Sequence, residues 1–207
     1  GSDAGIGWHP WLDSKWEKDV NEWATHSIWV GLFDILIKNK VINNYYEFKH
    51  NLPLSKSNTI GFASRCEGRK NPHYLENLDC FIFTNSLEFN LFWKNGVGLN
   101  YDKAKIYHYY GNFKDKFYGM DWGISHSAFT SEPFGYGIFE SVDRGKLPIL
   151  HSTWCKDFEY PYRVSSKKEF VDIYNKVCND TYETKNYWFN KIKNYMIHNY
   201  SDKQLWI

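Results

Sequence analysis

Two glutamates flank a glycine-containing stretch, EPFGYGIFE, at residues 132–140. Glu132 and Glu140 stand eight positions apart, and Gly135 and Gly137 lie between them. If a helix begins here, the glycines leave the backbone N–H groups of its first turn uncovered, and such groups bind phosphate. Glu132 would then stand beside the helix start, where a carboxylate can accept hydrogen bonds from sugar hydroxyls. Glu140 would lie two turns along the helix with its side chain directed back toward the N-terminus, which suits a ribose diol.

A second charged pair, Arg65 and Lys70, stands five positions apart in a basic loop. Arg offers a planar fork of donors for phosphate oxygens and Lys offers a point charge, so the two can hold one anion. Two solvated surface cations are the alternative. Likewise, an ordinary strand-to-helix loop with two solvated carboxylates is the alternative for Glu132 and Glu140. The chemistry therefore depends on whether the fold brings the two pairs together.

Short apolar runs alternate with amphipathic stretches from residue 59 to residue 180. They predict strands at 59–63, 80–83, 105–110, 122–125, 147–150 and 163–164, and helices at 73–78, 134–144, 167–178 and 182–198. Asn71 is expected to cap the first of these helices, and Ser165 or Ser166 the third. The alternation favours an α/β fold: a Rossmann-like parallel sheet with helices on both faces. Ligands bind such sheets at the carboxyl ends of the strands, so we expect four loops to gather there: 64–71, 111–119, 125–137 and 151–157.

The first 58 residues differ from the rest of the chain in composition and in hydrophobic pattern. They are rich in Trp, and apolar residues at helical spacing between Asp13 and Leu36 predict a helix. Residues 49–58 are polar, contain one Pro and are interpreted as a linker. We therefore divide the chain into an N-terminal segment with an inter-domain linker at 1–58, and a domain with two C-terminal helices at 59–207.

Composition sets limits on function. The 207 residues carry a net charge of +1 at a pI of about 7.8, so no global field directs the protein to nucleic acid or to a membrane. No apolar run approaches the length of a membrane span. Four cysteines without a Cys-x-x-Cys motif fit neither a zinc site nor a disulfide scaffold. We expect a reduced protein of the bacterial cytoplasm. The 20% aromatic content, with abundant Asn, Lys and Ile, is typical of an AT-rich coding genome, and a phage gene is one such source.

Taken together, these residues resemble the C-terminal, donor-binding half of retaining GT-B fold glycosyltransferases, the glycogen-synthase-like glycosyl transferases group 1. There a strand ends in Gly-Arg or a similar pair, with Lys five residues after the Arg. A later block contains E-P-F-G-x-x-x-x-E-A-x-x-x-G-x-P-V. This chain has Ser64-Arg65 with Lys70, and then a matching block from Phe129 to Ile149. The resemblance covers roughly residues 40–207.

The resemblance implies a role for each matching residue. Arg65 and Lys70 would hold the donor pyrophosphate and stabilise the leaving nucleoside diphosphate, while Glu132 would bind the transferred sugar, so these three are the implied catalytic residues. Glu140 would bind the nucleoside ribose. The full implied donor-binding set is Ser131, Phe134, Gly135, Tyr136, Gly137 and Glu140. The implied co-substrate is a nucleoside-diphosphate sugar, and we expect a UDP-sugar; no cofactor or metal ion is implied, and no Asp-x-Asp motif occurs.

Several positions depart from the family pattern. Ser64 replaces the usual Gly before Arg65, and Asn71 follows Lys70 where the family often has Gly. Ser141 and Val142 replace a small Ala and its neighbour. Lys146 is inserted in the Gly-x-x-Pro step. None of these departures removes a charged group that the donor site needs.

A complete enzyme of this fold has a second domain that supplies the acceptor contacts, and only about 58 residues precede the donor half. We expect a truncated chain or a reduced first domain. Residues 34–44 resemble the inter-domain crossing. His9, Asp13 and His26 are isolated candidates for the reacting centre. We expect this chain alone to bind donor weakly and to transfer poorly.

The acceptor is left open. More loosely, residues 109–112 and the composition resemble phage enzymes that glucosylate hydroxymethylated DNA bases. Four lysines could line a DNA path or form a solvated face: Lys103, Lys105, Lys114 and Lys116. Cell-surface polysaccharide, lipid-linked and protein acceptors are the alternatives, and a nucleotide-binding or interaction domain without transfer is the rival class. The sequence does not indicate the oligomeric state.

Overall fold

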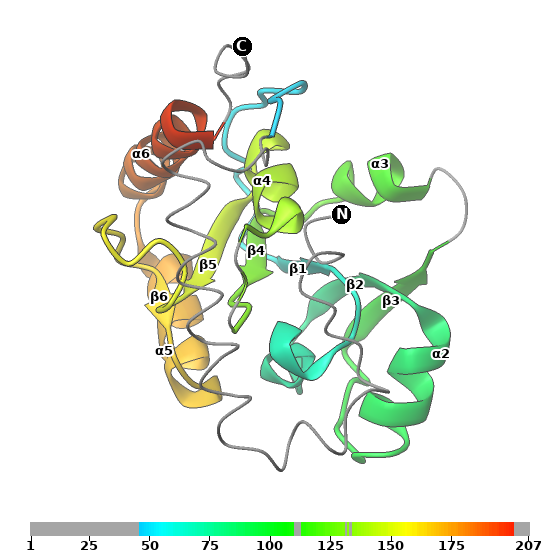
Figure 1. Cartoon of the computed structure of the whole chain (residues 1–207). Helices are drawn as coiled ribbons and strands as arrows, with labels where there is room; N and C mark the ends of the chain where they lie inside the picture. Colours follow the sequence, from blue (N-terminus) through cyan, green and yellow to red (C-terminus); the bar gives the residue numbers. More distant parts are fainter. Residues whose placement is uncertain (1–45, 110–112, 131, 133, 201–207) are drawn as a thin grey trace, which may run out of the picture.

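A computed structural model describes residues 46–109, 113–130, 132 and 134–200 (Figure 1). The helix predicted between Asp13 and Leu36, the crossing at 34–44 and the candidate Ser131 lie outside the described residues. So do the isolated candidates His9, Asp13 and His26.

Six strands of the described part form one sheet, in the order β3-β2-β1-β4-β5-β6. Every neighbouring pair is parallel. This is the order of doubly wound dinucleotide-binding folds, and it reverses direction between β1 and β4. The predicted Rossmann-like α/β fold is therefore confirmed. The strands are β1 (Ile60–Ala63), β2 (Cys80–Thr84), β3 (Ala104–His108), β4 (Ile124–Ser127), β5 (Leu147–His151) and β6 (Arg163–Val164).

Helices cover both faces of the sheet, as Figure 1 shows. One face carries α3 (Phe113–Tyr118), α4 (Tyr136–Asp143) and α6 (Tyr182–Tyr200). The other carries η5 (Pro72–Leu75), α2 (Ser86–Glu88), η6 (Phe89–Lys94) and α5 (Lys167–Asn179). Successive side chains of a strand point to opposite faces, so Phe81 and Phe83 pack with α3 while Cys80 and Ile82 belong to a larger core cluster that also includes residues of α4, α5 and α6.

The strand predicted at 122–125 begins two residues later, at Ile124. Trp122 does not continue the strand because its indole packs against β1 at Gly61. A Cβ atom on Gly61 would lie 2.3 Å from the indole ring. The indole N–H donates to the carbonyl of Phe117 at 2.8 Å. Trp122 thus fills the space between α3 and the sheet, and only Gly is small enough at position 61.

The predicted cap at Asn71 was wrong. Asn71 adopts the left-handed conformation with φ 51°, and no side-chain cap bond forms. Its amide instead donates to the carbonyl of Ala128 at 2.7 Å and to the hydroxyl of Thr130 at 2.9 Å. The helix predicted at 73–78 is correspondingly a single 3₁₀ turn, η5. Asn71 therefore ties the loop after β1 to the loop after β4.

The remaining helices agree with the sequence to different degrees. The two C-terminal helices are confirmed, and Ser166 is the cap of α5, accepting from the N–H of Glu169 at 3.2 Å. The helix predicted at 134–144 is shorter and starts at Tyr136. The segments 86–94 and 113–118 were not predicted to be helical. Among the described residues, no helix is both long enough and apolar enough to cross a membrane.

Candidate functional site

A cavity of about 400 Å³ lies at the carboxyl ends of β1 and β4, where the strand order reverses. Doubly wound folds bind their ligands at this point. Seven of the nine residues predicted from the sequence line it: Arg65, Lys70, Glu132, Gly135, Tyr136, Gly137 and Glu140. The other lining residues are Ala63, Ser64, Phe83, Tyr109, Lys114 and Phe129. The fold therefore brings the two charged pairs to one place.

Lys70 and Glu132 form a buried ion pair inside this cavity. Lys70 is the last residue of η4 (Gly68–Lys70), and Glu132 lies in the loop after β4. The lysine ammonium also lies 4.6 Å from the ring centroid of Phe129, on the negative face of the aromatic ring. The pair joins the two loops on either side of the switch point and fixes both side chains at the cavity.

Arg65 is oriented by Glu67, a residue that no sequence motif singled out. The Glu67 carboxylate is almost fully buried and lies between two guanidinium groups, 2.9 Å from Arg65 Nη1 and 3.0 Å from Arg69 Nε. Arg65 keeps 43% of its side chain exposed at the cavity. Glu67 thus fixes the Arg65 fork while offsetting part of its positive charge.

The start of α4 forms another wall of the cavity. Gly135 precedes the helix in the left-handed conformation, with φ 77°, and no side chain caps the first turn. Gly137 brings the helix close to the sheet, because a Cβ atom there would lie 3.4 Å from the carbonyl oxygen of Ala63 at the end of β1. The uncovered N–H groups and the positive end of the helix dipole favour an anion in this wall.

Serine hydroxyls hold α4 to the sheet. Ser141 donates to the carbonyl of Gly137 at 2.8 Å and lies 3.0 Å from the hydroxyl of Ser125 on β4. Ser125 in turn lies 2.9 Å from Ser127. Ser141 is one of the departures from the family pattern, and its hydroxyl is buried but hydrogen-bonded, so the departure leaves the helix in place.

Phe134 lies in the core rather than at the cavity. Its ring stacks on Phe139 with centroids 4.5 Å apart, and its carbonyl accepts from the indole of Trp154 at 3.1 Å. The side chain therefore fixes the chain entering α4. The place of Phe134 in the donor-binding set, which the family resemblance implies, stays a prediction.

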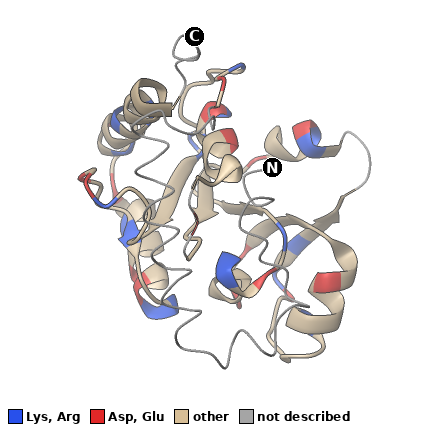
Figure 2. Ribbon diagram, viewed as in Figure 1, with Lys and Arg blue, Asp and Glu red and all other residues tan. Residues whose placement is uncertain are grey.

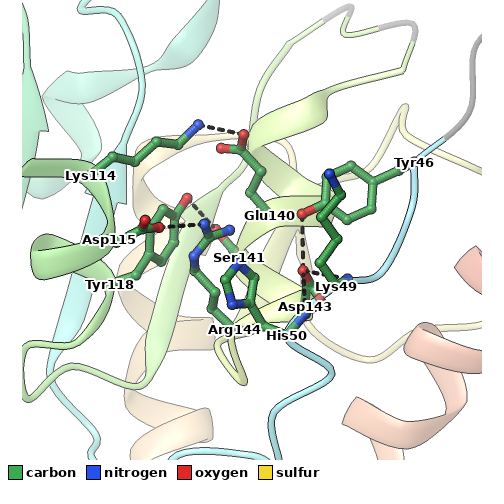
Figure 3. Close-up of polar contacts among 10 residues, drawn as sticks. All are labelled: Tyr46, Lys49, His50, Lys114, Asp115, Tyr118, Glu140, Ser141, Asp143 and Arg144. Atoms are coloured by element: carbon green, nitrogen blue, oxygen red, sulfur yellow. Dashed lines mark hydrogen bonds and ion pairs between the residues drawn. The ribbon is translucent and has the colours of Figure 1, made fainter. Parts of the chain in front are cut away.

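Glu140 is paired with Lys114, which belongs to the helix α3 that was not predicted. The two side chains point toward one another across the gap between α3 and α4 (Figure 3). The next residue on α3, Asp115, accepts from Arg144 at 2.7 Å, and the Arg144 guanidinium lies 4.7 Å from the Tyr118 ring centroid. In the sequence, Lys114 was a candidate only for a DNA path, because no pattern indicated that it pairs with Glu140.

Asp143 anchors the segment before the sheet onto the same helix, as Figure 3 shows. The side chain is fully buried. Its carboxylate accepts from the backbone N–H groups of Lys49, His50 and Asn51 at 2.7 to 3.2 Å, and from the Tyr46 hydroxyl at 3.2 Å. Beyond Glu140 this segment borders a second hollow of about 460 Å³, lined by Tyr46, Glu47, Lys49, His50, Tyr136, Glu140 and Arg144.

His126 on β4 supports the loop that carries Lys70. Its Nε2 lies 2.9 Å from the carbonyl oxygen of Asn71. Complete burial lowers the pKa of His126 to about 3, so the ring is neutral at physiological pH. A neutral imidazole bonded at this carbonyl adds no charge to the cavity, and the charges there come from the Lys, Arg and Glu residues alone.

The four lysines considered for a DNA path have different surroundings. Lys114 faces Glu140, Lys105 lies over the Phe81 ring and Lys116 lies over the Phe113 ring. Lys105 belongs to β3, an edge strand of the described sheet, where lysines discourage pairing with other chains. Figure 2 shows that Lys and Arg are spread over the described ribbon, with Asp and Glu close to many of them.

Among the described residues, no group of three or more His, Cys, Asp or Glu side chains is placed to hold a metal ion. Comparison with protein-family models and with curated protein sequences found no match.

Proposed function

We propose that this chain binds a nucleoside-diphosphate sugar in the 400 Å³ cavity and is the donor half of a retaining GT-B glycosyltransferase. One observation carries the proposal. Three cations, two carboxylates and an uncapped helix start, from the segments that follow β1, β3 and β4, line a single cavity at the switch point of the sheet. A diphosphate needs the cations and the N–H groups, whereas a sugar and a ribose need the carboxylates.

The buried ion pair suits this ligand. The ammonium of Lys70 has three N–H donors, so it can keep Glu132 and still donate to a phosphate oxygen. Glu132 has several lone pairs beyond the one facing Lys70, and sugar hydroxyls can donate to them. The donor would therefore join an existing arrangement, with the diphosphate toward Lys70 and Arg65 and the sugar toward Glu132.

The reaction would separate charge at the diphosphate. The bond between the anomeric carbon and the phosphate oxygen breaks, its electron pair stays on that oxygen, and the anomeric carbon becomes cationic. The acceptor hydroxyl forms the new bond on the face that the diphosphate leaves, and its proton passes to the departing phosphate oxygen. In this scheme Arg65, Lys70 and the start of α4 would stabilise the growing negative charge, which would lower the barrier. In this scheme neither glutamate is the base.

The acceptor follows from a weaker resemblance. A hydroxymethylated DNA base of a phage is our first proposal, and cell-surface polysaccharide or lipid-linked acceptors are the alternatives. We propose that the groups that bind the acceptor belong to a separate acceptor domain. A DNA acceptor would show a steep dependence of binding on salt, because phosphate contacts release counterions.

A nucleotide-binding domain without transfer is the second candidate. It is favoured by the pairing of the charged groups, since Arg65, Lys70 and Glu140 each already face a charged partner. A cation already paired with a carboxylate stabilises the growing negative charge of a leaving diphosphate less, and this disfavours the transfer step. Both candidates bind a nucleotide, but only the first turns it over.

Two measurements test the proposal. The first is a thermal-shift assay with UDP, GDP, ADP and the corresponding nucleoside-diphosphate sugars, in which the ligands of one nucleoside should stabilise the protein. If none of them stabilises the protein, both candidates are refuted. Nucleotide release is then followed with hydroxymethylated DNA, unmodified DNA and a polysaccharide. A Glu132→Ala variant should lose the preference for the sugar-bearing nucleotide while still binding the nucleoside diphosphate. Equal loss of both affinities would contradict its proposed role.

A further inference from the structure

The Lys114–Glu140 pair has a geometry that the proposed function leaves unexplained. Lys114 comes from α3 and Glu140 from α4, and both line the cavity (Figure 3). The ammonium bonds Oε1 of the carboxylate. Glu140 keeps only 22% of its side chain exposed, while Lys114 keeps 45%. The carboxylate is thus largely enclosed, and a single cation from a different element fixes its direction.

We propose that Lys114 is a positioning residue that holds Glu140 for a pair of neighbouring hydroxyls, so that the site selects ribonucleotides over 2′-deoxyribonucleotides. The inference rests on the proposed function. A carboxylate has about four lone-pair positions, and the ammonium occupies the Oε1 side. The remaining acceptors face in a fixed direction. A vicinal diol can use two of them at once, whereas a deoxyribose can use one.

Lys114 also offsets a charge that would otherwise oppose the ligand. Glu140 is an anion in the cavity proposed to receive a diphosphate. Like charges in a partly enclosed cavity repel more strongly than they do in bulk water. With the ammonium on Oε1, the carboxylate can accept hydrogen bonds without contributing a full negative charge to the site. An unpaired Glu140 would suit the ribose but disfavour the diphosphate.

The pair is not needed to hold α3 in place. Asp115 and Arg144 join the same two helices independently, at 2.7 Å. Phe117 and Tyr118 of α3 are buried in the aromatic cluster with Trp122. Removing the Lys114 ammonium should therefore leave the helix where it is, so that a change in nucleotide binding reports on the orientation and charge of Glu140.

The alternative is an ordinary exposed ion pair. Such pairs contribute little to stability, and their loss is often unmeasurable. Lys116 provides the matched control, because it lies two residues along α3, is exposed and does not line the cavity. A change at Lys116 alters the net charge of α3 by the same amount as a change at Lys114. Any general electrostatic effect on an anionic ligand should appear in both variants.

The test uses titration calorimetry on the full chain with UDP and 2′-deoxy-UDP. If another nucleoside diphosphate gives a larger thermal shift than UDP, its ribose and 2′-deoxyribose forms are used instead. The variants are Lys114→Met, Lys114→Arg and Lys116→Met, each checked by its urea midpoint. We expect the wild type to prefer the ribonucleotide about tenfold or more, as one hydrogen bond to a charged group provides. Lys114→Met should lose most of that preference, Lys114→Arg should restore much of it, and Lys116→Met should match the wild type.

Two results in Lys114→Met would overturn the inference alone. One is an unchanged preference in Lys114→Met; the other is an equal weakening of both nucleotides in that variant, which would make Lys114 a simple phosphate contact. If the wild type binds the ribonucleotide and deoxyribonucleotide equally, the inference also fails while nucleotide binding stands. Failure of every diphosphate to bind the wild type would instead overturn the proposed function and this inference with it.

Discussion

Two carboxylates one turn apart on α4 have opposite surroundings (Figure 3). Asp143 is fully buried, and three backbone N–H groups and one hydroxyl donate to it. Glu140 lines a cavity and is bonded to one ammonium. Both are acids of the same helix, yet one is saturated with donors from the protein and the other retains capacity to accept.

This difference separates a structural acid from a candidate binding acid. A carboxylate whose lone pairs all face protein donors has nothing to offer a ligand, and its removal leaves those donors buried without partners. A carboxylate with one partner in a cavity can accept more, and its removal costs the fold little. Asp143 therefore belongs to the scaffold that holds residues 46–51 against α4, and Glu140 belongs to the cavity.

The largest effect on stability is expected at the saturated acid. Asp143→Ala should lower the free energy of unfolding by about 3–5 kcal/mol, because several buried donors lose a charged acceptor together. Urea denaturation followed by tryptophan fluorescence measures this. Glu140→Ala is the matched control and should stay within about 1 kcal/mol of the wild type. Similar losses in the two variants would remove the distinction between the two acids.

The buried Lys70–Glu132 pair is expected to rank second, because it is both buried and in the cavity. Lys70→Met leaves the Glu132 carboxylate without its cation and should cost about 3 kcal/mol of stability. The double variant Lys70→Met with Glu132→Leu should recover much of the loss, since no buried charge remains. Urea midpoints of the single and double variants test this. Additive losses would mean that the pair is not energetically coupled.

The sheet and most of the site could be predicted from the sequence because their signals are local. Buried parallel strands are short apolar runs, and the Glu-Pro-Phe-Gly block carries its own charges and glycines. The loops that follow β1 and β4 then meet because parallel strands share one carboxyl edge. The parallel-sheet pattern therefore predicted that the loops carrying Arg65, Lys70 and Glu132 share one edge, and the family resemblance grouped them with Glu140; all four line one cavity.

The contacts that were missed depend on partners far away in the sequence. Asp143 bonds residues more than 90 positions earlier, and Lys114 reaches Glu140 across 26 positions. The Asn71 side chain prefers a loop 57 positions away over its own helix start. Trp122 leaves the predicted strand to pack at Gly61. In each case tertiary packing outweighs the local preference, and no single-sequence pattern records it.

The third expected effect falls on the ligand and not on the fold. Glu140→Gln keeps the size of the side chain but removes the charge that binds Lys114 and that we propose binds the ribose. We expect about a tenfold weaker affinity for the nucleoside diphosphate, the amount that a lost hydrogen bond to a charged group produces. The urea midpoint should stay within error. Titration calorimetry measures the affinity. Asp143→Asn is the control variant: it should shift the urea midpoint and change the affinity less than Glu140→Gln does. A larger stability loss in Glu140→Gln than in Asp143→Asn would reverse the assignment.

The smallest effect concerns His126. Burial keeps the imidazole of His126 neutral, whereas the buried carboxylate of Asp143 is surrounded by hydrogen-bond donors. Burial lowers its pKa from 6.5 to about 3, so the unfolded chain takes up a proton first as the pH falls below 6.5. Stability is therefore complete above that pH and is lost progressively as the pH falls toward 3. Between pH 7.5 and 6.0 this residue alone should reduce the folded-to-unfolded ratio about fourfold.

The pKa values of His73 and His151 are also lowered by burial and act in the same direction. Urea denaturation of wild type and His126→Gln at both pH values isolates the contribution of His126. An identical pH dependence in the two proteins would show that His126 binds protons equally in the folded and unfolded chains.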